Sequence, residues 1–416
     1  MGAFVVEGQH RLQGTVRING AKNSALKLMV AALLGQGVFN LENVPRITDV
    51  HTMAGVLECL GARVKFKDHA MEIEVASLHG HTPEHLVKSM RASVQVMGPL
   101  LARLGWVEVA LPGGCAIGTR PLDIHLAGLQ QMGASISVNE EVLVARAPSG
   151  LHGADITFRY PSVGATENIM MAAALARGET VIRNAAQEPE IVDIQDFLNA
   201  MGAQIEGAGT SVIRVKGVKD LGCTDYVVMP DRIEAGTYLL AFLVTGGQGT
   251  LTHVQPQHFS SLLNVVRSMG GEIEASSDKV LVSSPKRFRP LRVVTGPYPG
   301  FPTDLQPQIV VAATQAHGRS ELRETVFDRR FGYLSELSKL GAVVKQRHQD
   351  VVVYGPTKLR GAHLEAGDLR AGAALVLAAL AAEGESRVLG SHHVDRGYEA
   401  FEDKLRALGA HISKVE

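Results

Sequence analysis

The sequence predicts an α/β protein built from six similar units, which form two domains of three units each. Three observations lead to this prediction. The chain has 416 residues, which is more than one domain usually holds. A helix end followed by a glycine and a strand recurs at nearly constant intervals, and apolar helices recur in the same rhythm. We therefore expect helices inside each domain and sheets outside.

The recurring motif ends a helix, places a glycine and starts a strand. Its six copies centre on glycines that are 72, 69, 68, 71 and 68 residues apart. Glycine at this position supplies the left-handed backbone conformation that ends a helix. Chance matches would not keep this spacing, so the motif marks six units of about 70 residues. The glycines are Gly61, Gly133, Gly202, Gly270, Gly341 and Gly409.

Each unit also contains an apolar helix that is followed by a glycine and a short strand. The clearest examples are 24–37, 167–178, 307–318 and 371–384. These helices are apolar on nearly all sides, which predicts that they are buried. They are shorter than the roughly 20 residues that cross a membrane, so no membrane partner is expected. The glycines that we expect to close the helices are Gly37, Gly105, Gly178, Gly249, Gly318 and Gly384.

Charge, cysteine content and missing motifs exclude several classes of function. Lysine and arginine number 41 against 42 acidic residues, and no basic stripe appears, which disfavours a nucleic-acid partner. The three cysteines are odd in number and widely spaced, which argues against disulfides and favours the cytoplasm. The first residues, MGAFVVEGQHR, show no basic segment followed by a long apolar stretch, so we expect no secretory signal. P-loop, Rossmann and zincin motifs are missing, so we expect no cofactor and no metal.

The starts of the predicted buried helices carry polar and charged residues. A helix N-terminus attracts anions through its free amides and the positive end of its dipole. Capping is the simpler explanation for the acidic and hydroxyl residues, which are Ser162, Asp231, Asp304 and Asp368. It does not explain the cations Lys22, Arg91 and Arg370, which oppose the dipole unless an anion binds beside them.

The segment LPGGCAIGTRP (111–121) places Cys115 in a glycine-rich context and Arg120 five residues later. Protein cores do not usually hold a cysteine in such a segment, and a nearby cation favours the thiolate. We therefore expect a reactive thiol, with an inert buried cysteine as the alternative.

Three further residues are candidates for contact with a ligand. Asp304 follows a proline-rich turn and is either a base acting on a sugar hydroxyl or a helix cap, two roles that are compatible. Arg330 and Arg396 precede amphipathic helices in consecutive units. Surface arginines are usually only solvated, but this repeated placement favours a ligand role.

Together these motifs resemble those of the UDP-N-acetylglucosamine 1-carboxyvinyltransferases, the enolpyruvyl transferases of peptidoglycan synthesis. The matching motifs follow the family's order from one end of the chain to the other. The most specific are the cysteine segment and NGAKN. The motifs are NGAKN (19–23), MRAS (90–93), LPGGCAIGTRPLDIH (111–125), SVGAT (162–166), EPEIVD (188–193), PDRIEAGTY (230–238), FPTD (301–304), DLRAG (368–372) and DRGYE (395–399).

The resemblance implies a two-domain inside-out α/β barrel with the active site in the cleft between its domains. The N-terminal domain would comprise 22–229 with the Cys115 segment, and the C-terminal domain would comprise 1–21 and 230–416. The implied reaction transfers the enolpyruvyl group of phosphoenolpyruvate to the 3-hydroxyl of UDP-N-acetylglucosamine. It would run by addition, through a tetrahedral intermediate, and elimination of phosphate.

The resemblance also implies a biological setting. The protein would be a monomeric cytoplasmic transferase that catalyses the first committed step of peptidoglycan synthesis, and so serves cell-wall biogenesis, cell shape and cell division. Fosfomycin would inhibit it, because its epoxide would alkylate Cys115.

Roles for single residues follow from the same resemblance. Lys22, Arg120 and Arg396 would clamp phosphoenolpyruvate, and Arg330 and Arg370 would assist at its carboxylate. Asn23 would hold the reacting sugar oxygen and Asp304 would take its proton. Cys115 would protonate the methylene carbon, form a covalent adduct with phosphoenolpyruvate and assist product release. Contacts to the UDP-sugar would come from Arg91, Pro121, Leu122, Asp123, Ile124, Ser162, Val163, Gly164 and Val326, and supporting roles would fall to Glu188, Glu190, Asp231 and Asp368.

Two other functions remain open from the sequence. One is the enolpyruvyl transferase of the same fold that acts on shikimate 3-phosphate, although it lacks the cysteine segment. The other is a sugar-nucleotide-binding repeat protein without catalysis, against which the presence of both Cys115 and Asp304 argues. One departure from the family pattern lies at Tyr160, where some members carry a lysine that would contact the diphosphate.

Overall fold

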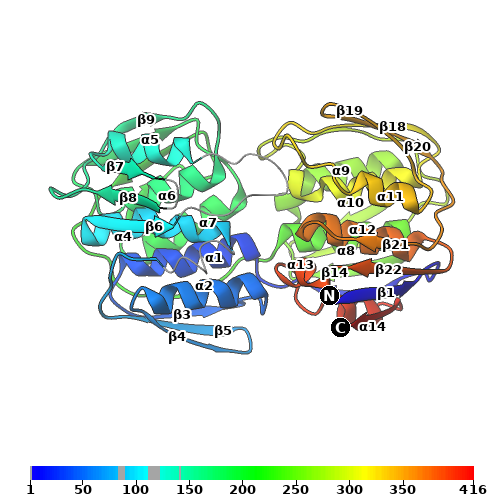
Figure 1. The fold of residues 1–416 in the computed structure, drawn as a ribbon, viewed down its shortest axis with the longest axis horizontal. Coiled ribbons are helices and arrows are strands. Elements are labelled where there is room, and N and C mark those ends of the chain that lie inside the picture. Colours follow the sequence, from blue (N-terminus) through cyan, green and yellow to red (C-terminus); the bar gives the residue numbers. More distant parts are fainter. Residues whose placement is uncertain (1, 83–89, 111–121, 140–141) are drawn as a thin grey trace. The chain divides into compact units, whose positions relative to one another are not determined.

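The computed structural model describes residues 2–82, 90–110, 122–139 and 142–416. They divide into two compact units. The N-terminal unit comprises the described residues between 20 and 229, and the C-terminal unit comprises 2–19 and 230–416. In Figure 1 the strand at the N-terminus, β1, is drawn beside the red elements of the chain's other end, within the C-terminal unit.

Each unit contains three separate sheets, and the described strands of all six follow one order. In the third sheet, β9 (Asp155–Thr157) runs parallel to β10 (Glu179–Arg183). Strand β10 is antiparallel to β12 (Val212–Lys216), which pairs with β11 (Gln204–Glu206) in the same antiparallel sense. This repeated order confirms an α/β fold built from six related repeats. The described strands do not close into a hydrogen-bonded barrel.

The other two sheets of the N-terminal unit follow the same order, the second with one strand fewer. In the second sheet, the leading parallel strand is reduced to one bridge between His81 and Glu108. The second sheet contains β6 (Trp106–Ala110), β8 (Val142–Arg146) and β7 (Ser135–Val138). The first contains β13 (Asp225–Val227), β3 (Gly37–Glu42), β5 (Ala70–Val75) and β4 (Arg63–Lys67).

The N-terminal strand of the chain completes a sheet of the C-terminal unit. Strand β1 (Ala3–Glu7) lies between β22 (Glu385–Leu389) and β23 (His411–Val415), and β21 (His363–Glu365) forms the edge. The next sheet contains β15 (Glu272–Ala275), β16 (Lys279–Ser283), β14 (Gln248–Thr252) and β2 (Gln13–Arg17). The last contains β17 (Arg292–Val294), β18 (Gly318–Arg323), β20 (Asp350–Gly355) and β19 (Val343–Arg347).

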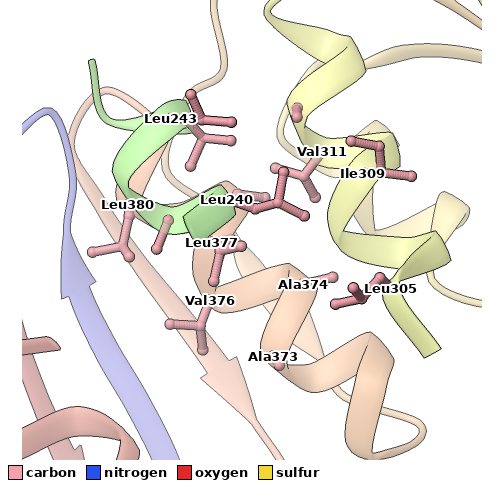
Figure 2. Packing of buried hydrophobic residues seen from close by; sticks show 14 of the residues in the cluster. Leu240, Leu243, Leu305, Ile309, Val311, Ala373, Ala374, Val376, Leu377 and Leu380 are labelled. Atoms are coloured by element: carbon pink, nitrogen blue, oxygen red, sulfur yellow. The ribbon is translucent and has the colours of Figure 1, made fainter. Parts of the chain in front are cut away.

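Three apolar helices form the centre of each unit, as the sequence predicts. All residues of α8 (Arg232–Val244) are buried. Figure 2 shows Leu240 of this helix close to side chains of α10 (Gln306–Thr314) and α12 (Leu369–Ala381). Each fully buried leucine stabilises the fold by about 2 kcal/mol. The corresponding helices of the N-terminal unit are α1 (Lys22–Ala31), α4 (Met97–Leu104) and α6 (Val163–Ala173).

In each of the six repeats, the second helix ends at the repeated glycine. All six glycines have φ between 94° and 105°, which confirms the predicted left-handed helix ends. The helices are α2 (Thr48–Cys59), α5 (Asp123–Gln131), α7 (Pro189–Ala200), α9 (Ser260–Met269), α11 (Leu334–Lys339) and α14 (Phe401–Ala407). Shorter helical turns are η1 (Ala32–Leu34), η2 (Arg91–Val96), η3 (Pro256–Phe259), η4 (Thr303–Leu305) and α13 (Ser391–Asp395).

The glycines predicted to close the apolar helices mostly lie beyond the helix ends. Gly105 caps α4 directly with φ 73°. The prediction is wrong for Gly37, Gly249 and Gly318, which belong to the strands β3, β14 and β18, and after α8 it is Gly246 that takes the left-handed turn. A short turn separates helix from strand here, so the sequence pattern placed the helix end too late. None of the described helices is long and apolar enough to cross a membrane.

Candidate active-site clusters

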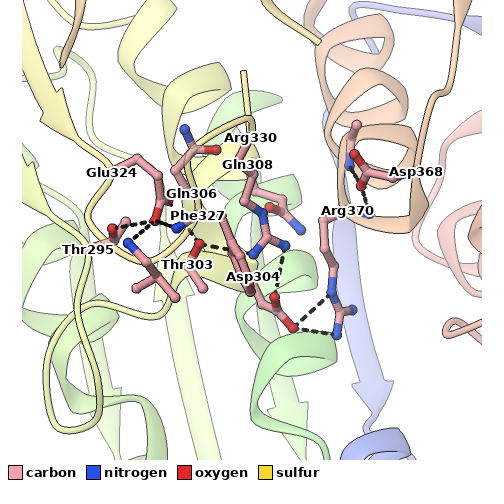
Figure 3. A network of polar contacts seen from close by, with 12 residues as sticks. Thr295, Thr303, Asp304, Gln306, Gln308, Glu324, Phe327, Arg330, Asp368 and Arg370 are labelled. Carbon is pink, nitrogen blue, oxygen red and sulfur yellow. Dashed lines mark hydrogen bonds and ion pairs between the residues drawn. The ribbon is translucent and has the colours of Figure 1, made fainter. Parts of the chain in front are cut away.

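In the C-terminal unit, Asp304 is held between two arginines. Arg330 donates from Nη2 to Asp304 Oδ1 at 2.8 Å, and Arg370 donates from Nη2 to Oδ2 at 3.0 Å (Figure 3). The arginine side chains are 3% and 5% exposed, whereas that of Asp304 is 28% exposed. Two guanidiniums beside one carboxylate leave a net positive charge at a partly open position. Such a position favours an anionic ligand.

A chain of hydrogen bonds fixes Arg330 from behind. Its Nη1 donates to Thr303 Oγ1 at 2.9 Å, and this hydroxyl donates to Glu324 Oε2 at 2.9 Å. Glu324 is fully buried, and its other oxygen accepts the backbone N–H of Val326 at 2.8 Å and the hydroxyl of Thr295 at 2.9 Å. The loop after β18 is therefore tied to the start of α10.

Arg370 is placed by the start of α12. Asp368 caps this helix by accepting the backbone N–H groups of Arg370 at 2.8 Å and of Ala371 at 2.9 Å. The guanidinium lies 5.5 Å from the centre of the Tyr398 ring. Burial alone would lower the pKa of Arg370, but the charge of Asp304 outweighs burial and raises it, with a smaller contribution from Asp231, which caps α8. Asp368 and Asp231 thus act as the expected caps.

The capping prediction is wrong for Asp304 itself. Asp304 lies within η4, and no side chain caps η4 or α10. Burial alone would raise the pKa of this carboxyl, but Arg370 and Arg330 outweigh burial and hold the pKa well below its usual range. The group is therefore ionised, and an anion that neutralised the arginines would make it a stronger base.

In the N-terminal unit, Lys22 forms an ion pair at the start of α1. Its Nζ lies 2.7 Å from Asp49 Oδ2, on the first turn of α2. The two side chains are 12% and 5% exposed. Lys22 and Asn23 open α1, where the backbone amides are free of helical partners. The sequence reasoning missed Asp49, which shows only as an acidic residue in the first turn of an amphipathic helix.

The start of α6 is the second element of this unit with predicted substrate contacts. Ser162 caps the helix by accepting the backbone N–H of Ala165 at 3.3 Å, as expected. Val163 and Gly164 follow it and are half-buried. Tyr160, two residues before the cap, is 39% exposed. Of the predicted acidic residues, Glu188 and Glu190 are buried at the start of α7.

The other predicted residues are less closely linked to these clusters. Asp123 is exposed and forms an ion pair with Arg159, while Leu122 and Ile124 are half-buried. Arg396 follows α13 and is half-buried. Cys115, Arg120 and Pro121 lie outside the described residues, as does the side chain of Arg91, whose backbone opens η2.

One group of side chains in the described part of the chain could hold a metal ion. Glu7, His10 and His411 present ligand atoms within 4.8 Å of one another. His411 and Glu7 face each other across strands β1 and β23, and their side chains are 57% and 64% exposed. Neither Asp304 and its two arginines nor Lys22 and Asp49 belong to this group.

Comparison with known proteins decides the family. The family model of EPSP synthase (3-phosphoshikimate 1-carboxyvinyltransferase) matches residues 6–405. The chain belongs to this enolpyruvyl transferase family. UDP-N-acetylglucosamine 1-carboxyvinyltransferase 2 of Carboxydothermus hydrogenoformans is 47% identical over 418 residues, covering 100% of both chains. UDP-N-acetylglucosamine 1-carboxyvinyltransferase 1 of Caldanaerobacter subterraneus is 47% identical and covers 98% of both chains.

Solved structures of enolpyruvyl transferases share the fold. The enolpyruvyl transferase NikO from Streptomyces tendae has a TM-score of 0.90 at 24% identity, covering 100% of this chain and 99% of that one. EPSP synthase from Acinetobacter baumannii has a TM-score of 0.78 at 16% identity, covering 100% of both chains. The predicted fold class is therefore confirmed.

Proposed function

We propose that this enolpyruvyl transferase acts on UDP-N-acetylglucosamine. It transfers the enolpyruvyl group of phosphoenolpyruvate to the 3-hydroxyl of the sugar and releases phosphate. The observation that carries this proposal is the 47% identity, over nearly the whole chain, to relatives named for this reaction. This observation also favours the UDP-sugar over shikimate 3-phosphate as acceptor, although the family model bears the name of the shikimate enzyme.

The Asp304 cluster supports a role in proton transfer. Asp304 would take the proton of the sugar hydroxyl, while Arg330 and Arg370 would bind the carboxylate of phosphoenolpyruvate. In the structure the two guanidiniums pair with Asp304 instead. An anion that takes over these donors weakens their hold on Asp304 and raises its pKa. Binding of phosphoenolpyruvate would therefore activate the base that the reaction needs.

The remaining groups complete the proposed reaction. Lys22, Arg120 and Arg396 would hold phosphoenolpyruvate, and Asn23 the reacting oxygen. Cys115 would deliver a proton to the methylene carbon. Addition then gives a tetrahedral intermediate, which loses phosphate and one proton of its new methyl group to form the enolpyruvyl ether. The product would enter peptidoglycan synthesis in the cytoplasm and so serve cell shape and division, with the enzyme acting as a monomer.

The test mixes the purified protein with phosphoenolpyruvate and an acceptor and follows phosphate release. We expect release with UDP-N-acetylglucosamine and none above background with shikimate 3-phosphate. The reverse pattern would assign the shikimate reaction. Tight binding of UDP-N-acetylglucosamine without phosphate release would favour the non-catalytic binding protein.

A further inference from the structure

A buried polar network joins three helical elements of the N-terminal unit. Glu167 on α6 is fully buried, and its Oε2 lies 3.3 Å from Lys27 Nζ on α1. The same oxygen accepts a hydrogen bond from Gln95 Nε2, in η2, at 3.0 Å. The Lys27 side chain is 10% exposed. One carboxylate oxygen thus binds donors from two neighbouring elements.

Both donors also reach the backbone of residues with a proposed role in substrate binding. Lys27 Nζ donates to the carbonyl of Asn23 at 3.0 Å, and Gln95 Nε2 donates to the carbonyl of Gly164 at 3.1 Å. Lys27 lies one helical turn after Asn23, and Glu167 nearly one turn after Gly164. Glu167 therefore connects the starts of α1 and α6 through two short paths.

Stability of the fold does not by itself explain this network. Removing two charges from water costs free energy that their attraction only partly offsets, so apolar residues of similar size often stabilise a core as well. The neighbouring residues Leu26 and Met170 are apolar and at most 1% exposed. A charged pair buried in the core instead imposes a defined geometry on the helices that carry it, because its hydrogen bonds are directional.

We propose that Glu167 is a positioning residue that, through Lys27 and Gln95, holds the starts of α1 and α6 in the arrangement that binds the UDP-sugar. This inference rests on the proposed function and adds to it residues that contact no substrate. Loss of the network would weaken binding of the sugar nucleotide, because Asn23 and Gly164 would lose their fixed separation.

The ionisation of Glu167 offers a readout that a purely structural residue would not give. Burial raises the pKa of Glu167 to about 7, with Lys27 opposing this effect and Glu190 and Glu188 adding to it. Lys27 faces the carboxyl from α1, and the two glutamates face it from the start of α7. Above that pKa the carboxylate is charged and pairs with Lys27. Affinity for the UDP-sugar should therefore increase as the pH rises from 6 to 8.

The experiment measures the Kd of UDP-N-acetylglucosamine by calorimetry for the wild type, Glu167→Gln and the double variant Lys27→Met/Glu167→Gln. The double variant leaves no unpaired charge in the core, so we expect its Tm to stay close to that of the wild type. Its Kd should nevertheless rise about tenfold, the effect of losing one hydrogen bond to a charged group. The change in Kd centred near pH 7 should disappear in both variants. A change centred near pH 6 belongs instead to Asp193, which accepts a hydrogen bond from Ser24 beside Asn23 and whose pKa burial raises to about 6.

Thr180→Val is the matched control. Thr180 is fully buried on β10 of the same unit, and its hydroxyl has no hydrogen-bond partner among the described residues. This variant should bind the UDP-sugar as the wild type does.

Different outcomes separate this inference from the proposed function. If the double variant binds UDP-N-acetylglucosamine with wild-type affinity, the inference is wrong and the proposed function stands. A double variant that fails to fold, or a control that loses affinity equally, would assign the pair a structural role and also overturn the inference. If the wild type does not bind UDP-N-acetylglucosamine, the proposed function fails and the inference fails with it.

Discussion

The two units carry different polar networks at corresponding positions, one helical turn behind the starts of their central helices. In the N-terminal unit, Lys27 lies four residues after Asn23 and forms the buried ion pair with Glu167. In the C-terminal unit, Gln308 lies four residues after Asp304 and donates to Thr237 Oγ1 at 3.3 Å and to Tyr398 OH at 3.4 Å. The first network is charged and the second is neutral.

The difference reflects where each unit holds its charges. In the C-terminal unit two arginines hold Asp304 at the helix starts, and behind them the buried Glu234 on α8 pairs with the less buried Lys404 at 2.6 Å. The N-terminal unit has one ion pair at the start, Lys22 with Asp49, and a second behind it. Related units thus preserve their backbone while their polar networks diverge. We expect pH near neutrality to act on the N-terminal unit through Glu167, the pKa of which burial raises to about 7.

Cys115→Ser tests whether covalent reactivity is confined to one cysteine, and it carries the largest expected effect. Fosfomycin should label the wild type at Cys115 and should not label the variant at all. All three cysteines lie between residues 20 and 229 of the sequence, and the other two, Cys59 and Cys223, are exposed. They are internal controls for exposure without activation, and peptide mass spectrometry locates the adduct. Labelling of Cys59 with Cys115 untouched would contradict the prediction.

Asp304→Asn tests the charged helix starts of the C-terminal unit. It should lower kcat by about 10² to 10⁴-fold, the usual contribution of a general base. The KM for phosphoenolpyruvate should stay the same or fall, because the arginines no longer pair with an internal carboxylate. Steady-state phosphate release gives both constants. A raised KM with unchanged kcat would show that Asp304 binds substrate and does not act as the base.

Arg370→Lys tests the geometry of the same cluster. Lysine keeps the charge but cannot reproduce the paired donation from Nε and Nη2 to Asp304, at 3.3 and 3.0 Å. We expect the KM for phosphoenolpyruvate to rise about tenfold, as for the loss of one charge-assisted hydrogen bond. Lys414→Arg, on the exposed surface of the same unit, is the control and should leave KM unchanged.

The smallest expected effect is a difference between the two units in how their stability depends on pH. Burial raises the pKa of Glu167 to about 7. The stability that this group contributes is therefore complete at a pH below the ordinary pKa of a glutamate side chain, and it is lost as the pH rises through 7. The arginines hold the pKa of Asp304 low, so its contribution is lost only in strong acid. Stability should therefore fall between pH 6 and 8 through Glu167, whereas the contribution of Asp304 stays constant over this range.

Hydrogen exchange can measure this difference within one molecule. After correction for the intrinsic rates, amides of α6 should lose protection between pH 6 and 8, whereas those of α10 should keep it. Glu167→Gln should remove the change in α6. Equal changes in both helices would mean that Glu167 is not the titrating group.

The sequence predicted the fold because its signals are local and repeated. Six glycines with one spacing marked the helix ends, and Asp231 and Asp368 showed cap chemistry directly before their helices. Asp304 has the same local appearance, yet it pairs with arginines 26 and 66 residues away. Lys27 with Glu167, and Lys22 with Asp49, are also tertiary pairs. Such pairs leave no mark in a local pattern, so the sequence could not reveal them.

The most direct test of the central claim is the structure of the product. Phosphoenolpyruvate labelled with ¹³C is incubated with UDP-N-acetylglucosamine and either the wild type or the Asp304→Asn variant, and the products are examined by NMR. The wild type should give an enolpyruvyl ether on O3 of the sugar, and the variant should give almost none in the same time. Label found only in unreacted phosphoenolpyruvate or in free pyruvate with the wild type would contradict the proposed reaction.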